Sequence, residues 1–138
     1  MPERSWEATK RFVYERAQGC CEYCRTCDTN TGQTMHVEHI LPNGDNDPEN
    51  LCLACPNCNL SKAVAVIVVD ALTGSSVPLF NPRRQRWSEH FVWIDNYTRI
   101  QGRTAIGRAT VERLKMNRPR MVSVRQRWAK ANLHPPID

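Results

Sequence analysis

The chain contains two Cys-x-x-Cys pairs, Cys21-Glu22-Tyr23-Cys24 and Cys55-Pro56-Asn57-Cys58, with 30 residues between them. Each pair makes a tight turn that points two sulfur atoms in the same direction. Two such turns complete the tetrahedral site of four thiolates that is typical of structural Zn²⁺. Because zinc binding of this kind is coupled to folding, we expect the metal to hold the N-terminal half of the chain together.

The other three cysteines make the register of the first pair ambiguous. Cys27 forms a further Cys-x-x-Cys pair with Cys24, and Cys20 directly precedes the first pair. We favour the pair quoted above because Gly19 ends a helical stretch and leaves the next residues free to turn. Cys52 lies in an apolar run and is expected to be a small core residue.

The redox environment is predicted from the cysteine count and the start of the chain. Seven cysteines are an odd number, and the chain begins with the polar segment Met1-Pro2-Glu3-Arg4, without the pattern of a signal peptide. These features argue against disulfides and predict a reducing, cytoplasmic location.

A second group of polar residues lies between and just after the two cysteine pairs. It consists of the adjacent Glu38 and His39, then Asn50, and finally Asn59 directly after the last cysteine. Structural zinc would not need the histidine, so the pattern indicates a separate reactive site. Imidazole has a pKa suited to taking a proton from water near neutral pH, which makes His39 a candidate general base. The alternatives are a packed histidine, a solvated Glu38 and an Asn59 that caps a helix.

These residues resemble the zinc-bearing branch of the HNH endonuclease family. The resemblance is carried by three segments, His36-Val37-Glu38-His39-Ile40, Asn50-Leu51 and Cys55-x-x-Cys58-Asn59-x-x-Lys62, and extends over residues 8–65. It implies a ββα-metal core within an α+β fold, in which a histidine activates water for phosphodiester hydrolysis.

The resemblance also assigns roles to single residues. It implies that His39 is the base, that Glu38 and Asn59 hold a catalytic Mg²⁺ or Mn²⁺, and that Asn50 orients the loop that carries the base. Carboxylate and amide oxygens suit these hard cations. Three further residues are candidate phosphate contacts, with solvated or packed side chains as the alternative: His36, Lys62 and Arg83.

Charge divides the chain into two segments. Residues 1–82 hold 6 Lys/Arg and 10 Asp/Glu, a balance of −4, whereas residues 83–130 hold 13 Lys/Arg and 3 Asp/Glu, a balance of +10. We therefore expect an HNH core with zinc knuckles over 1–69 and a basic extension over 70–138 that packs on it. The basic segment fits a polyanion such as nucleic acid, although a solvated basic face is equally consistent with it.

Periodicity and turn residues predict the secondary structure. No apolar run is long enough to span a bilayer. We expect Val77–Pro82 to cross the surface, because it holds two prolines in six residues. The predicted elements are helices over 6–18, 57–65, 104–116 and from Pro119 onward, strands over 35–40 and 51–53, an extended stretch over 66–69, and a hairpin of 91–94 with 98–101.

The sequence thus predicts a metal-dependent endonuclease that acts on nucleic acid, with DNA as the expected substrate. A zinc-ribbon-like module that binds nucleic acid without cutting it would explain the cysteines and arginines. It would leave Glu38, His39, Asn50 and Asn59 unexplained as a set. A structural adaptor is the third alternative.

Overall fold

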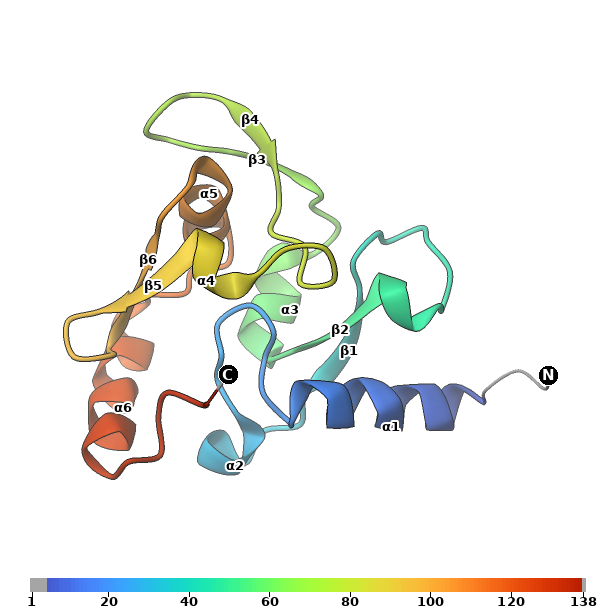
Figure 1. Ribbon diagram of the computed structural model, residues 1–138, viewed down its shortest axis with the longest axis horizontal. Coiled ribbons are helices and arrows are strands. Elements are labelled where there is room, and N and C mark those ends of the chain that lie inside the picture. Colours follow the sequence, from blue (N-terminus) through green and yellow to red (C-terminus); the bar gives the residue numbers. More distant parts are fainter. Residues whose placement is uncertain (1–4, 138) are drawn as a thin grey trace.

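The computed structural model describes residues 5–137 (Figure 1). Residues 1–4 and 138, which entered the charge count and the expectation about a signal peptide, lie outside the described residues. Within 5–137, no helix combines the length and the apolar character needed to cross a membrane.

The described residues form helices, one 3₁₀ turn and three two-stranded antiparallel sheets. In chain order these are α1 (Trp6–Ala17), α2 (Asp28–Thr31), β1 (His36–His39), η1 (Pro48–Asn50), β2 (Leu51–Ala54), α3 (Pro56–Lys62), β3 (Ile67–Val69), β4 (Ser76–Pro78), α4 (Trp87–His90), β5 (Phe91–Ile94), β6 (Arg99–Gly102), α5 (Ala105–Arg113) and α6 (Pro119–Lys130). The sheets pair β1 with β2, β3 with β4, and β5 with β6.

The hairpin of β1 and β2 lies between two helices, which cover its opposite faces (Figure 1). On one face, Leu51 and Leu53 pack with Val13 of α1. On the other face, Cys52 and Ala54 join the larger core cluster that contains the cysteine pairs of the N-terminal half. Strands β1 and β2 with helix α3 therefore form a ββα unit, which confirms the predicted α+β class.

Helix α1 is bounded by local signals that the sequence carries. Ser5 caps its start by accepting a hydrogen bond from the backbone N–H of Ala8 at 3.1 Å. Its end turns through Gln18 and Gly19, both at positive φ. A Cβ atom on Gly19 would lie 2.8 Å from the Tyr14 hydroxyl oxygen and from Asp28 Oδ1, so both the backbone and the space require glycine here.

The extension over 70–138 shares one hydrophobic core with the first half of the chain. Phe80, Trp87 and Leu114 belong to the same buried cluster as Tyr23 and the paired cysteines. Trp87 Nε1 donates a hydrogen bond to the carbonyl oxygen of Tyr23 at 2.7 Å, inside the first cysteine pair. The two segments are therefore packed together around this pair.

One stretch of the extension differs from the expectation of a surface segment over 77–82. Residues 76–78 form β4, which pairs with β3, and Leu79 and Phe80 are buried. Pro78 is tolerated because it is the last residue of this strand. The backbone N–H of Phe80 donates to the Thr110 hydroxyl at 3.0 Å, which fixes this stretch to α5.

The last two helices form largely as predicted. Thr104 caps α5 by accepting from the backbone N–H of Gly107, but α5 ends at Arg113 rather than at 116. The buried face of α6 carries Met121 and Trp128, and between them lies Arg125, which is fully buried. Its guanidinium donates to the backbone carbonyls of residues 98 and 116, which offsets the cost of burying the charge.

Candidate metal centre and active site

Four cysteine sulfurs converge between the first cysteine pair and the start of α3. The ligand atoms of Cys21, Cys24, Cys55 and Cys58 all lie within 4.8 Å of one another, and all four side chains are buried. The Sγ atoms of Cys24 and Cys55 are 3.6 Å apart. A tetrahedral Zn²⁺ with sulfur ligands at its usual bond length requires sulfur–sulfur distances of about 3.8 Å. The cluster is therefore positioned to hold a metal ion, and its donor set suits zinc.

Local hydrogen bonds shape the two cysteine turns. The backbone N–H of Cys24 donates to Cys21 Sγ at 3.5 Å, and that of Cys58 donates to Cys55 Sγ at 3.4 Å. Hydrogen bonds with the other three thiols lower the pKa of Cys24, whereas burial raises the pKa of Cys21. Four buried thiols this close together repel one another when ionised, so they are not all deprotonated without a metal. Metal binding at neutral pH must therefore release protons.

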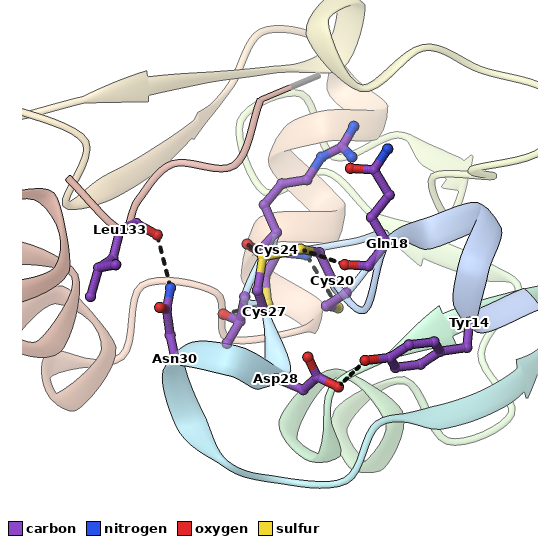
Figure 2. Close-up of a disulfide and its surroundings, with 11 residues drawn as sticks. Tyr14, Gln18, Cys20, Cys24, Cys27, Asp28, Asn30 and Leu133 are labelled. Atoms are coloured by element: carbon purple, nitrogen blue, oxygen red, sulfur yellow. Dashed lines mark hydrogen bonds between the residues drawn. A yellow bond between two sulfur atoms is a disulfide. The ribbon is translucent and has the colours of Figure 1, made fainter.

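The remaining cysteines settle the register of the first pair and correct one expectation. Cys20 and Cys27 form a disulfide, so neither is available as a ligand (Figure 2). This contradicts the prediction that the chain lacks disulfides. An odd cysteine count excludes only that all seven pair, and a short antiparallel bridge between these two residues brings their side chains together. Cys52 is a buried core residue as predicted, and burial raises its pKa to about 12.

His39 is the last residue of β1 and is held by a residue that sequence reasoning missed. Its Nε2 lies 2.7 Å from Asn46 Oδ1 in the loop after β1. An amide oxygen can only accept, so Nε2 carries the proton and Nδ1 of the neutral ring keeps its lone pair. Within residues 5–137, Nδ1 has no hydrogen-bond partner. The ring is therefore oriented as a proton acceptor requires.

Asn50 ties together the loop that carries this orienting amide. Its Oδ1 accepts from the backbone N–H of Leu41 at 2.9 Å, and its Nδ2 donates to the carbonyls of Leu41 at 3.2 Å and Asp45 at 3.0 Å. A Cβ atom on Gly44 would lie 2.4 Å from Asn50 Nδ2, so the loop closes tightly around the amide. The contacts of Asn50 match the orienting role that the family resemblance implies.

Glu38 points to the opposite face of the hairpin from His39, since successive strand residues alternate. Its Oε1 lies 3.3 Å from Lys62 Nζ, and Lys62 also donates to the backbone carbonyl of His39 at 3.1 Å. The Lys62 side chain is 1% exposed. Lys62 is thus a buried partner of Glu38 and His39, which argues against both the expected phosphate contact and the alternative of a solvated surface charge.

Asn59 and His36 occupy different positions relative to this group. Asn59 lies on α3 three residues before Lys62, on the same side of the helix, and so on the side that meets Glu38. His36 starts β1 and lies about 10 Å from His39 along the strand, given the rise per residue. Helix periodicity therefore places Asn59 on the side of α3 that carries Lys62, whereas His36 lies at the far end of β1 from His39.

Several arginines of the basic extension are engaged in structural contacts. Arg83 pairs with Glu22, and only 9% of its side chain is exposed, so the expectation of a phosphate contact at Arg83 is corrected. Arg108 binds Asp70 through two nitrogens. Arg84 is exposed and lines a hollow with Ile40 and Lys62, close to the end of β1. Arg84 is therefore more accessible to a bound molecule than Arg83, a difference that sequence alone does not reveal.

Comparison with known proteins agrees with this geometry. The family model described as HNH endonuclease matches residues 21–64, which contain both cysteine pairs, β1, β2 and α3. The match covers 44 of the 138 residues and confirms the resemblance seen in the sequence. The match supports a nuclease-type function in general, with nucleic acid as the substrate class. Neither the curated proteins nor the solved structures gave a match.

Proposed function

We propose that the protein is a metal-dependent endonuclease that hydrolyses phosphodiester bonds in DNA, with His39 as the general base. The observation that carries this proposal is the contact of His39 Nε2 with Asn46 Oδ1 at 2.7 Å. It leaves the lone pair of Nδ1 for a water molecule. A structural nucleic-acid-binding module would not need an imidazole fixed in this tautomer.

Glu38 and Asn59 would hold the catalytic Mg²⁺ or Mn²⁺ of this mechanism. Both offer the oxygen ligands that these cations prefer, and they lie on β1 and on α3, whose residue Lys62 contacts Glu38. Among residues 5–137, the four-cysteine cluster is the only group of three or more His, Cys, Asp or Glu ligands close enough for a metal ion. The catalytic cation would thus keep most of its ligands as water and phosphate oxygens. When bound, it supplies charge neutralisation at the scissile phosphate.

The chain's own residues perform the remaining steps. His39 Nδ1 takes a proton from the attacking water at the end of β1, and Asn46 stabilises the imidazolium that forms. Asn50 holds the loop so that Asn46 keeps its place. Lys62 fixes the strand end from the other face through the carbonyl of His39. The phosphate would lie across this strand end, within reach of Arg84.

Cleavage of labelled single- and double-stranded DNA with added Mg²⁺ tests the proposal. His39→Ala should keep its zinc and its melting temperature, yet cut roughly 10²–10⁴-fold more slowly than the parent, the usual contribution of a general base. Gln101→Ala, at an exposed position on β6, is the control and should cut like the parent. Salt-sensitive binding without cutting by the parent would instead support the non-catalytic module. Equal cutting by His39→Ala and the parent would exclude His39 as the base.

A further inference from the structure

Trp6, the first residue of α1, is 40% exposed beside the candidate general base. Its ring lies 6.4 Å from that of His39, measured between centroids, and the two ring planes differ by 8°. Tryptophan is usually largely buried, and the chain's residues Trp87 and Trp128 follow this rule at 7% and 9% exposed. The exposed indole therefore presents a flat apolar face next to the site where we place the reaction.

Basic side chains continue from this aromatic face along α1. Lys10 lies one turn after Trp6 on the same side of the helix, and Arg11 follows it. With Glu7, Tyr14 and His36 they line an open hollow of about 500 Å³ between α1 and β1. Lys10 pairs with Glu7, but this pair is on the surface, with the two side chains 40% and 78% exposed, so water and salt weaken it.

An aromatic platform beside a basic groove is the arrangement with which proteins hold single-stranded nucleic acid. Bases stack on the aromatic face, and the cations follow the phosphates. A base inside a duplex has both faces covered by its neighbours. It could meet the Trp6 ring only after leaving the stack, which costs a few kcal/mol for each base.

Building on the proposed nuclease function, we propose that Trp6 stacks on an unpaired nucleobase next to the scissile phosphate. The substrate is accordingly single-stranded at that nucleotide. Lys10 and Arg11 hold the phosphates that lead away from the cut. Trp6 is a binding residue and takes no part in proton transfer.

Binding of a short fluorescein-labelled DNA strand and of its blunt duplex, without added divalent metal, tests this inference by fluorescence anisotropy. Trp6→Ala should weaken binding of the single strand by about 5- to 150-fold, the usual worth of one stacked base. Trp6→Phe should fall in between. The slope of log affinity against log salt should stay unchanged, because stacking releases no counterions. Tyr97→Ala is the control, since Tyr97 is 51% exposed on the β5–β6 turn, far from α1 (Figure 1).

A double-mutant cycle sharpens the test. The parent and Trp6→Ala are compared on strands in which one nucleotide at a time, around the mapped cut, is replaced by an abasic site. One abasic position should weaken binding by the parent as much as Trp6→Ala does. The same abasic position should not weaken binding by Trp6→Ala any further, because both changes remove the same contact. The melting temperature of Trp6→Phe, which keeps an aromatic ring, shows whether weaker binding comes from the loss of stacking or from the loss of helix α1.

Failure of this inference can be told apart from failure of the proposed function. If the parent cuts DNA and Trp6→Ala binds the single strand equally well, the stacking role is wrong and the nuclease stands. Equal loss of single-strand and duplex binding in Trp6→Ala would also overturn it. A parent that neither binds nor cuts any strand would overturn both proposals.

Discussion

Lys62 Nζ lies 3.3 Å from Glu38 Oε1 and 3.1 Å from the carbonyl oxygen of His39, so one buried ammonium group contacts both residues of the Glu-His pair. A cation bound at Glu38 would meet this positive charge at close range. The contact therefore lowers the affinity of Glu38 for a divalent cation while it fixes the end of β1. The two effects can be separated by substitution.

Replacing Lys62 with Met should reduce the free energy of unfolding by roughly 3 kcal/mol, because it leaves the Glu38 carboxylate largely buried without its partner. The same change should lower the Mg²⁺ concentration for half-maximal cleavage, since the competing charge is gone. Urea unfolding and a Mg²⁺ titration measure the two quantities. Lys115→Met, at an exposed position, is the control. A higher Mg²⁺ requirement in Lys62→Met would show that the lysine assists the metal.

Replacing Asn46 with Asp should move the acid limb of the pH–rate profile to higher pH. A carboxylate beside His39 Nε2 stabilises the imidazolium, and only the neutral ring can accept a proton. The variant should therefore lose activity at a pH where the parent is still active. Asn43→Asp makes the same charge change in the same loop. A profile that shifts equally in both variants would indicate a general field effect and no specific orienting contact.

Replacing Cys58 with Ser should release the zinc and abolish cooperative melting of the described core, because metal binding and folding are linked. Elemental analysis and thermal melting check this. Cys52→Ser serves as the matched control, since Cys52 is equally buried but lies outside the four-sulfur cluster. It should lose stability and keep its zinc. Retention of zinc by Cys58→Ser would remove this residue from the ligand set.

Neutralising Arg84 should weaken DNA binding and reduce the slope of log affinity against log salt by roughly 0.7 for a single strand, the value for one lost phosphate contact. Arg83→Gln should leave the slope unchanged and lower the melting temperature, because Arg83 is occupied by Glu22. Arg120→Gln, exposed on α6, controls for the loss of one positive charge. An equal change of slope in Arg84→Gln and Arg120→Gln would mean that DNA binding depends only on the net charge of the protein.

Acid should destabilise the protein through Asp70. Hydrogen bonds from Arg108 and Thr73 hold the pKa of this carboxyl well below its usual range. A depressed pKa stabilises the folded state above the unfolded pKa of about 4, and this contribution is lost as pH falls toward the folded value. Asp70→Asn should therefore flatten the fall in melting temperature below pH ~4 relative to the parent. An unchanged acid dependence would exclude Asp70 as its source.

Local signals allowed much of the fold to be predicted from the sequence. The spacing of Cys21, Cys24, Cys55 and Cys58 predicts the metal cluster because two short turns fix four sulfurs with little help from the rest of the chain. The strands of the ββα unit and the hairpin of β5 and β6 follow from their alternating patterns and turn residues. The features that could not be predicted from the sequence depend on contacts between distant residues. The partners of Lys62 and Arg83 lie 24 and 61 positions away, so their charges look equally available in the sequence.

The candidate active site could also be predicted only in part, because some of its contacts join residues that are distant in the sequence. The resemblance pointed to His39 and Asn50, whose motif positions carry the signal. Asn46 lies in a loop rich in Asn, Gly and Asp, where any of several amides could have met the imidazole. Trp6 precedes His39 by 33 positions and looks like a helix-start residue until α1 is placed against β1. The positions of Asn46 and Trp6 beside His39 become apparent only from the fold.

The hydrogen bond from Trp87 to the Tyr23 carbonyl has a consequence for modularity. The donor belongs to the extension and the acceptor lies between two metal ligands, so the matched segment 21–64 does not contain everything that shapes its own zinc turn. Grafting that segment alone onto another protein would leave an indole-sized gap beside the knuckle. A functional graft would therefore need the first cysteine pair together with the extension over 70–138 that packs on it.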